Sequence, residues 1–309
     1  MRAEMTHLAA DLCGLRLKNP TILAAGILDE TGRSMVEVAR AGAGAIVTKS
    51  IGQEPRPGHQ NPTIVELPDG LLNAMGLPNP GIDIFKDEIL EARPGGVPII
   101  GSVFGGTEDE IANLAGAMEK AGADAVELNL SCPHAKGYGA ELGSTPEAVE
   151  MVCRKTKAKV SVPVFAKLTP NTSSIAALAL AAERGGADAV VAINTLKGMV
   201  ISPEARMPIL GNKVGGLSGP AIRPVGVRCV YEIFEAVKIP VIGVGGIVSG
   251  RDAIEYIMAG ARAVQIGTGV WYDGPEIFTK VCTQMIRFME ENGFGTVDEM
   301  VGVAHPGRN

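Results

Sequence analysis

The chain has 309 residues, of which 46% are hydrophobic, a proportion sufficient for a large buried core. Its formal net charge of −6 argues against a nucleic-acid partner, because binding to a phosphate backbone usually requires a basic face. No apolar run approaches the roughly 18 uncharged residues of a membrane span, and the N-terminus lacks the apolar core of a signal peptide. The five cysteines form no C-x-x-C pair and the four histidines are scattered, so we expect no disulfide framework, no metal site and a cytoplasmic location.

Along the chain, eight short apolar runs alternate with helical stretches. Four of the runs open with proline, which suits the first residue of a strand because its missing N–H need not join the ladder. Each of the other four follows a variant of the phrase Ala/Gly-Gly-Ala-x-Ala, in which glycine suits the left-handed residue that closes a helix. In chain order the runs are 20–25, 45–50, 98–103, 125–130, 163–168, 189–194, 240–245 and 263–268.

This alternation predicts an α/β fold, a (β/α)8 TIM barrel in a single domain over 1–309. We place the barrel core at about 20–270 and a closing helix at about 275–291. The segments 51–80 and 195–220 are predicted to be long loops after the second and sixth strands. A doubly wound sheet is the structural alternative, but it ordinarily carries a glycine fingerprint after its first strand, and Ala25-Gly26-Ile27-Leu28 does not supply one.

Polar residues end most of the predicted strands, at the face where catalysis takes place in this fold. Lys49 and Lys167 end buried runs, where a cation either holds an anion or only extends to solvent. Asn129 and Asn194 either bind a planar amide-like ligand or cap the following turn.

Glycines end the seventh and eighth predicted strands, in the pairs Gly245-Gly246 and Gly267-Thr268. This is the usual phosphate position in such barrels, because bare backbone N–H groups are available there. The structural alternative is tight barrel packing at glycine.

Cys132 differs from the other four cysteines because it lies just past the fourth strand, between Ser131 and Pro133. The others lie in apolar or helical surroundings that are typical of small core side chains. The segment that follows, 134–143, has the glycine content of a mobile lid. A thiol at this place can accept a proton or attack a carbon, so both roles stay open at this point.

Six motifs together resemble the class 1 dihydroorotate dehydrogenases, most closely the NAD-linked 1B type, along essentially the whole chain. They are Asn73-Ala-Met-Gly-Leu-Pro-Asn79-Pro-Gly81, Glu127-Leu-Asn129-Leu-Ser-Cys132-Pro133, Phe165-Ala-Lys167-Leu-Thr-Pro-Asn171, Asn194-Thr195, Gly216-Leu-Ser-Gly219-Pro-Ala-Ile222-Arg-Pro224 and Gly245-Gly246-Ile247.

The resemblance implies that FMN lies across the barrel mouth, with Lys167 near the N1/C2 edge of the flavin. Cys132 would then be the base that removes the C5 proton of dihydroorotate while the C6 hydride passes to flavin N5, giving orotate for pyrimidine (UMP) biosynthesis. The expected FMN contacts are Ala25, Lys49, Ser50, Ser102, Asn129, Lys167, Ile193, Gly219, Gly245, Gly246, Gly267 and Thr268. The expected contacts to the pyrimidine and its carboxylate are Lys49, Asn73, Ala74, Met75, Gly76, Leu77, Asn129, Asn194 and Thr195.

Three residues depart from the family pattern. Ala25 stands where serine is frequent, which leaves a backbone contact to the flavin, and Ser102 stands where asparagine is frequent. His134 replaces a common asparagine after Cys-Pro.

Partner subunits are also implied by the resemblance. This chain has no cysteine cluster for iron–sulfur and no nicotinamide fingerprint. The resemblance implies a homodimer within a heterotetramer, in which a second subunit with FAD and a 2Fe–2S cluster passes electrons to NAD.

Two other functions remain as alternatives. The stretch Asn-Leu-Ser-Cys-Pro-His134 resembles the flavin domain of dihydropyrimidine dehydrogenases, although the segment from Asn73 to Gly81 looks like an orotate-binding loop. A barrel aldolase that uses Lys167 as a Schiff-base amine explains the lysine and the phosphate site but gives Cys132 no role.

Overall fold

Eight parallel strands close into a barrel in the computed structural model, which describes residues 8–130 and 142–307. Each strand pairs with the next along the chain, and the last pairs with the first, which confirms the single-domain TIM barrel. Each of the eight predicted runs contributes one strand. They are β3 (Thr21–Leu23), β4 (Ala45–Val47), β7 (Ile99–Val103), β8 (Ala125–Asn129), β9 (Val164–Leu168), β10 (Ala189–Ala192), β15 (Val241–Val244) and β16 (Ala261–Ile266).

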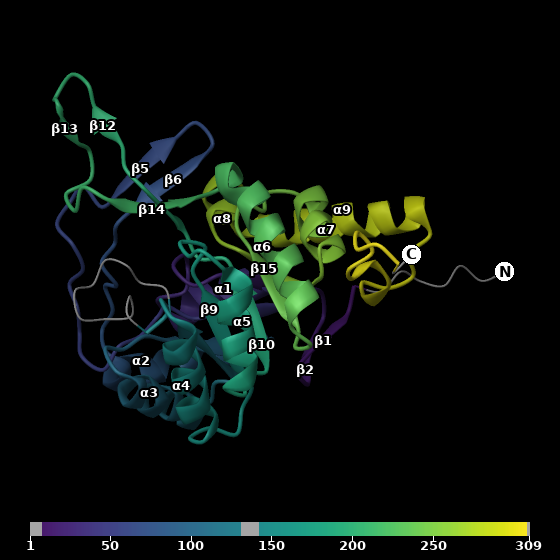
Figure 1. Ribbon diagram of the computed structural model, residues 1–309, viewed down its shortest axis with the longest axis horizontal. Coiled ribbons are helices and arrows are strands. Elements are labelled where there is room, and N and C mark those ends of the chain that lie inside the picture. Colours follow the sequence, from purple (N-terminus) through teal and green to yellow (C-terminus); the bar gives the residue numbers. More distant parts are fainter. Residues whose placement is uncertain (1–7, 131–141, 308–309) are drawn as a thin grey trace.

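Helices lie between the strands and cover the outside of the barrel (Figure 1). Five of them begin after a Thr or Ser whose hydroxyl accepts a hydrogen bond from the backbone N–H three residues on, the usual N-cap. The helices are α1 (Gly32–Arg40), α2 (Ile82–Ala92), α3 (Glu108–Lys120), α4 (Pro146–Lys157), α5 (Ile175–Arg184), α6 (Arg223–Ala236), α7 (Gly250–Met258), α8 (Thr268–Asp273) and α9 (Ile277–Asn292). Short 3-10 turns occur at Arg93–Gly95, Pro220–Ile222, Gly274–Glu276 and Asp298–Met300.

The repeated glycine motif closes helices, as predicted. Gly42, Gly122, Gly186 and Gly260 follow α1, α3, α5 and α7, and all four have positive φ. Glycine adopts this conformation without the steric cost of a Cβ, so the chain reverses direction at once and enters the next strand.

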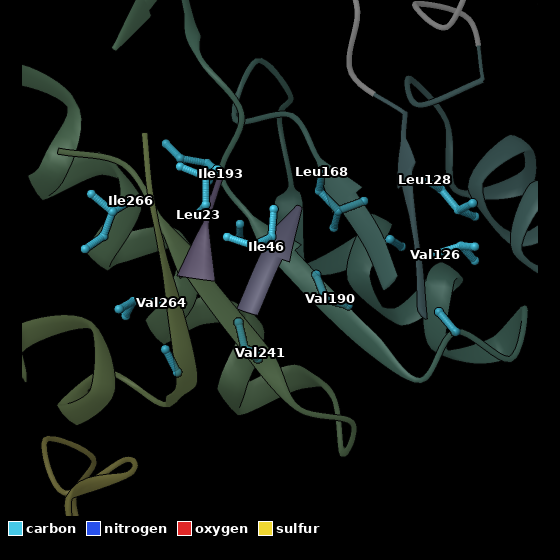
Figure 2. Close-up of a cluster of buried hydrophobic side chains, with 14 of the residues drawn as sticks. Leu23, Ile46, Val126, Leu128, Leu168, Val190, Ile193, Val241, Val264 and Ile266 are labelled. Atoms are coloured by element: carbon cyan, nitrogen blue, oxygen red, sulfur yellow. The ribbon is translucent and has the colours of Figure 1, made fainter. Parts of the chain in front are cut away.

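Strand side chains alternate between two hydrophobic layers, as the pleat requires. Leu23, Ile46 and Val190 belong to the cluster that also contains buried residues of the surrounding helices (Figure 2). Their neighbours Ile22, Val47 and Val191 belong to a second cluster. That cluster also contains Leu12 and Leu17 of the hairpin formed by β1 (Ala10–Leu12) and β2 (Leu15–Leu17).

The segments after the second and sixth barrel strands were predicted as loops, and that prediction was wrong. They contain β5 (Ile64–Leu67), β6 (Gly70–Asn73), β11 (Leu196–Gly198) and β14 (Gly215–Ser218), which form one antiparallel sheet in the order β11-β14-β6-β5. A hairpin of β12 (Ile201–Ser202) and β13 (Met207–Pro208) projects beyond it (Figure 1). The turn signal Pro68-Asp69-Gly70 marks the β5–β6 hairpin in the sequence, whereas the β6–β14 pairing joins residues that are at least 143 positions apart.

Within residues 8–130 and 142–307, no helix has both the length and the apolar character needed to cross a membrane. In the same part of the chain, no group of three His, Cys, Asp or Glu side chains could hold a metal ion.

Candidate active site

A cavity of about 440 Å3 opens at the C-terminal ends of the barrel strands. It lies beside the four-stranded sheet β11-β14-β6-β5, which we call the added sheet. This volume lies within the usual range for small-molecule sites. All of the predicted cofactor and substrate residues that the structure describes line it, with the exception of Ser102. They are Ala25, Lys49, Ser50, Asn73, Ala74, Met75, Gly76, Leu77, Asn129, Lys167, Ile193, Asn194, Thr195, Gly219, Gly245, Gly246, Gly267 and Thr268.

Ser102 lies behind the cavity wall. It is the fourth residue of β7, and its side chain is fully buried. Its Oγ lies 2.8 Å from Ser50 Oγ, and its N–H donates to Thr48 Oγ1 at 3.0 Å. The expected direct contact of Ser102 with a cofactor therefore does not match its position; it supports Ser50 instead.

A row of polar side chains crosses the cavity floor from Ser50 to Asn194. Asn129 Nδ2 donates to Ser50 Oγ at 3.1 Å, and Asn194 Nδ2 lies 3.4 Å from Asn129 Oδ1. Asn194 Oδ1 also accepts the backbone N–H of Thr195 at 2.7 Å. These contacts link the ends of three strands, so the amide groups are held in place before a ligand arrives.

Asn73 enters the cavity from the added sheet rather than from the barrel. It is the last residue of β6, and its Nδ2 donates to the Gly216 carbonyl of β14 at 3.4 Å. Gly216 packs so closely on Thr195 that a Cβ at this glycine would lie 2.1 Å from Thr195 Oγ1. The added sheet thus brings the motif that begins at Asn73 to the C-terminal end of β10, the sixth barrel strand.

Lys49 is held at the cavity by acidic residues of the loop before α1. Its side chain is only 10% exposed, and its Nζ donates to Glu30 Oε1 at 2.9 Å. The backbone N–H of Lys49 donates to the Asp29 carbonyl at 3.1 Å. Burial raises the pKa of the Asp29 carboxyl to about 6, against the partial compensation of the nearby Lys49 charge.

Lys167 is held inside the barrel by Glu127 and Gln265, neither of which was predicted to be a site residue. Its Nζ lies 3.2 Å from Glu127 Oε1 and 3.1 Å from Gln265 Oε1. Gln265 Nε2 in turn donates to Glu127 Oε2 at 2.6 Å. Glu127 and Gln265 are fully buried. A charged or polar residue in the middle of an apolar strand was the available signal for both.

Glycines form the cavity wall at the ends of β15 and β16. Gly245 and Gly246 have φ of 127° and 71°, and a Cβ at Gly246 would lie 2.7 Å from the Gly219 carbonyl oxygen. Buried Tyr256 fixes this turn from behind, because its hydroxyl donates to the Gly245 carbonyl at 2.7 Å. Bare backbone therefore faces the cavity where a phosphate was predicted.

The described cysteines are poor candidates for a base at neutral pH. Burial raises the pKa of Cys13 and of Cys153 to about 12, and it also raises the pKa of Cys229 and of Cys282. Cys132 and His134 lie outside the described residues.

The sequence matches the family model of dihydroorotate dehydrogenase over residues 7–289. The chain belongs to the dihydroorotate dehydrogenase family. The matched region contains all eight barrel strands and the residues that line the cavity.

Archaeal relatives in the dihydroorotate dehydrogenase family are similar over nearly their whole length. The chain is 53% identical over 302 residues to a protein of Methanocaldococcus jannaschii, covering 96% of this chain and 98% of that one. It is 54% identical over 300 residues to a protein of Thermoplasma acidophilum, covering 97% and 99%. Both relatives are named dihydroorotate dehydrogenase B (NAD(+)), catalytic subunit.

A solved structure has the same fold. The dihydroorotate dehydrogenase of Eimeria tenella, in complex with ferulenol, superposes with a TM-score of 0.84 at 21% identity. The superposition covers 99% of this chain and 90% of that one.

Proposed function

We propose that this chain oxidises (S)-dihydroorotate to orotate in pyrimidine biosynthesis, with FMN as its resident cofactor. The observation that carries the proposal is the meeting of two sets of residues in one cavity. Asn73, Asn129 and Asn194 offer amide donors and acceptors for a pyrimidine. Lys167 and the glycine turn at Gly245 offer a cation and bare backbone for a flavin and its phosphate.

The residues present fit FMN. Gly245 and Gly246 have positive φ, and a Cβ at Gly246 would collide with the Gly219 carbonyl oxygen. This turn therefore needs glycine, and no side chain covers its backbone where a phosphate would lie. Ile193 and Val244 give the cavity wall apolar surface that suits a flavin ring. When bound, FMN would supply the acceptor for the hydride that leaves C6 of the substrate.

The side chains of this chain bind, orient and deprotonate the substrate. The Lys49 ammonium pairs with the substrate carboxylate, and the three asparagines hydrogen-bond to the ring N–H and C=O groups. We assign the removal of the C5 proton to Cys132, whose thiolate takes that proton as the C6 hydride leaves. The two C–H bonds that break leave their remaining electron pair as the C5=C6 double bond of orotate.

The aldolase alternative is disfavoured by the surroundings of Lys167. Two of its three N–H groups are taken up by Glu127 and Gln265, so the amine acts as a hydrogen-bond donor within the barrel. A Schiff-base lysine needs a free lone pair to attack a carbonyl carbon.

We further propose that the electrons leave through a second subunit that carries FAD and a 2Fe–2S cluster and reduces NAD in the cytoplasm. The name of the relatives, which describes them as NAD(+)-linked catalytic subunits, supports this. Two copies of the present chain would form a homodimer inside the heterotetramer, a state that sedimentation of the chain alone and with the second subunit can test.

The decisive experiment is the visible spectrum of the purified chain before and after anaerobic addition of dihydroorotate. We expect a flavin spectrum that bleaches with dihydroorotate and not with dihydrouracil. Faster bleaching by dihydrouracil would favour the dihydropyrimidine dehydrogenase alternative, and a colourless protein that cannot be reconstituted with FMN would overturn the proposal. NAD reduction by the isolated chain would contradict the role of the second subunit.

A further inference from the structure

Three polar side chains meet inside the barrel, below the cavity. Glu127 comes from β8, Lys167 from the neighbouring β9, and Gln265 from β16 on another part of the barrel wall. They form a closed ring of contacts at 3.2, 3.1 and 2.6 Å. The Lys167 side chain is 7% exposed and the Glu127 side chain is fully buried, so little water screens the pair.

The chemistry of the ring fixes the orientation of Gln265. Its amide oxygen faces the Lys167 ammonium, and its NH2 group faces the Glu127 carboxylate. The flipped amide would place two donors together and two acceptors together, so only one orientation satisfies both neighbours. Gln265 therefore holds both charged groups at once.

The ring leaves one N–H of Lys167 for the cavity. An ammonium has three N–H groups, and two of them are directed at Glu127 and Gln265. Lys167 also lines the cavity, where the third N–H can reach a ligand. Burying an ammonium without such partners would destabilise the folded chain. The ring supplies these partners, so it orients the Lys167 ammonium and makes its burial in the barrel possible.

We propose that Glu127 and Gln265 are positioning residues for Lys167, and that the Glu127 charge lowers the reduction potential of the bound flavin by offsetting that of Lys167. The inference rests on the proposed function, because it requires FMN in the cavity. A cation near the flavin pyrimidine edge favours the more negative, reduced cofactor. A carboxylate 3.2 Å behind that cation weakens the effect and keeps the flavin easier to reoxidise.

The test is the midpoint potential of FMN in the wild-type chain and in Glu127→Gln, measured by anaerobic dye titration. We expect the variant to bind FMN within a few-fold of wild type, and to shift the ratio of oxidised to reduced flavin at least tenfold toward reduced. For a two-electron couple this shift is about 30 mV to more positive potential.

Three further variants separate positioning from a general loss of structure. Lys167→Met should lower the potential, and Glu127→Gln should shift it little in the Lys167→Met background, because the cation that Glu127 positions and offsets is then absent. The exchange Glu127→Gln/Gln265→Glu returns a carboxylate to the ring and should restore the potential toward wild type. Melting curves of all variants report on the fold.

The matched control is Glu119→Gln. Glu119 accepts hydrogen bonds from Ser161 and Val162, which precede β9, so this variant removes a charge near the opposite end of the same strand. It should leave the potential unchanged. An unchanged or lower potential in Glu127→Gln, or a shift of equal size with and without Lys167, would overturn the inference. Failure of the wild-type chain to bind FMN would instead overturn the proposed function.

Discussion

The Nζ atom of Lys49 lies 2.9 Å from Oε1 of Glu30, so a carboxylate of the loop before α1 holds the ammonium that lines the cavity. Glu30 is two-thirds exposed, whereas Lys49 is nearly buried. An exposed partner can move away when a substrate carboxylate takes its place. On the proposed function, the pair would keep the Lys49 cation at the cavity until the substrate carboxylate replaces Glu30.

Lys49→Met should weaken substrate binding more than FMN binding. Loss of a hydrogen bond to a charged group costs about 1.5–3 kcal/mol, which corresponds to roughly 10- to 150-fold in KM for dihydroorotate. Titration of orotate against the flavin spectrum measures the same loss directly. Glu30→Gln is the matched control and should leave orotate affinity equal or slightly higher; weaker binding in this control would contradict the role given to Lys49.

Cys132→Ala should retain FMN and lose most of its turnover with dihydroorotate, because only the proton acceptor is removed. General base catalysis contributes about 10²- to 10⁴-fold, so we expect a loss in that range. Cys282→Ala is the control, since burial raises the pKa of that thiol and it should have no part in the reaction. Rates of flavin reduction by the wild type should rise with pH toward the ordinary thiol pKa of about 8.5, and a flat profile between about pH 6 and 9 would argue against a cysteine base.

Gly246→Ala should lower FMN affinity at least tenfold. The substitution places a Cβ 2.7 Å from the Gly219 carbonyl oxygen at a φ of 71°. Gly293→Ala is a control for the backbone conformation alone, because its φ is 76° and no atom lies within 4 Å of the new Cβ. It should cost about 1–2 kcal/mol of stability and leave FMN binding unchanged. Equal FMN affinity in the two variants, measured by fluorescence quenching of the free flavin, would exclude a specific phosphate role for Gly246.

Asp29→Asn should change how stability depends on pH. The pKa of Asp29 rises from 3.8 to about 6 in the folded chain, so the folded state binds this proton more tightly than the unfolded state. The contribution of Asp29 to the free energy of unfolding is therefore fully present below about pH 3.8 and is lost as pH rises through 6. The loss amounts to about 3 kcal/mol. Urea unfolding at pH 4 and pH 7 measures this effect. Between the two pH values, the free energy of unfolding of the variant should rise relative to that of the wild type by an amount of this order.

Asp83→Asn serves as the comparison for the pH experiment, because the Asp83 side chain is 90% exposed. It should follow the wild-type curve at both pH values. A parallel curve for Asp29→Asn as well would contradict the raised pKa.

Local sequence signals were enough to predict the barrel and most of the residues that line its cavity. Eight proline-led or glycine-preceded runs became eight strands, because local signals decide where strands begin and helices end. Parallel strands in a closed barrel all end at the same face. Placing Lys49, Asn129 and Lys167 at strand ends was therefore enough to bring them to one cavity.

The contacts between residues across the barrel could be read from the three-dimensional arrangement alone. The ring of Glu127, Lys167 and Gln265 joins three strands whose members are up to 138 residues apart, and the added sheet pairs β6 with β14 over a similar separation. Ser102 was expected at the cavity but lies behind Ser50. Local propensity carries no information on such contacts, because they depend on strand stagger and on which side chains point into the closed barrel.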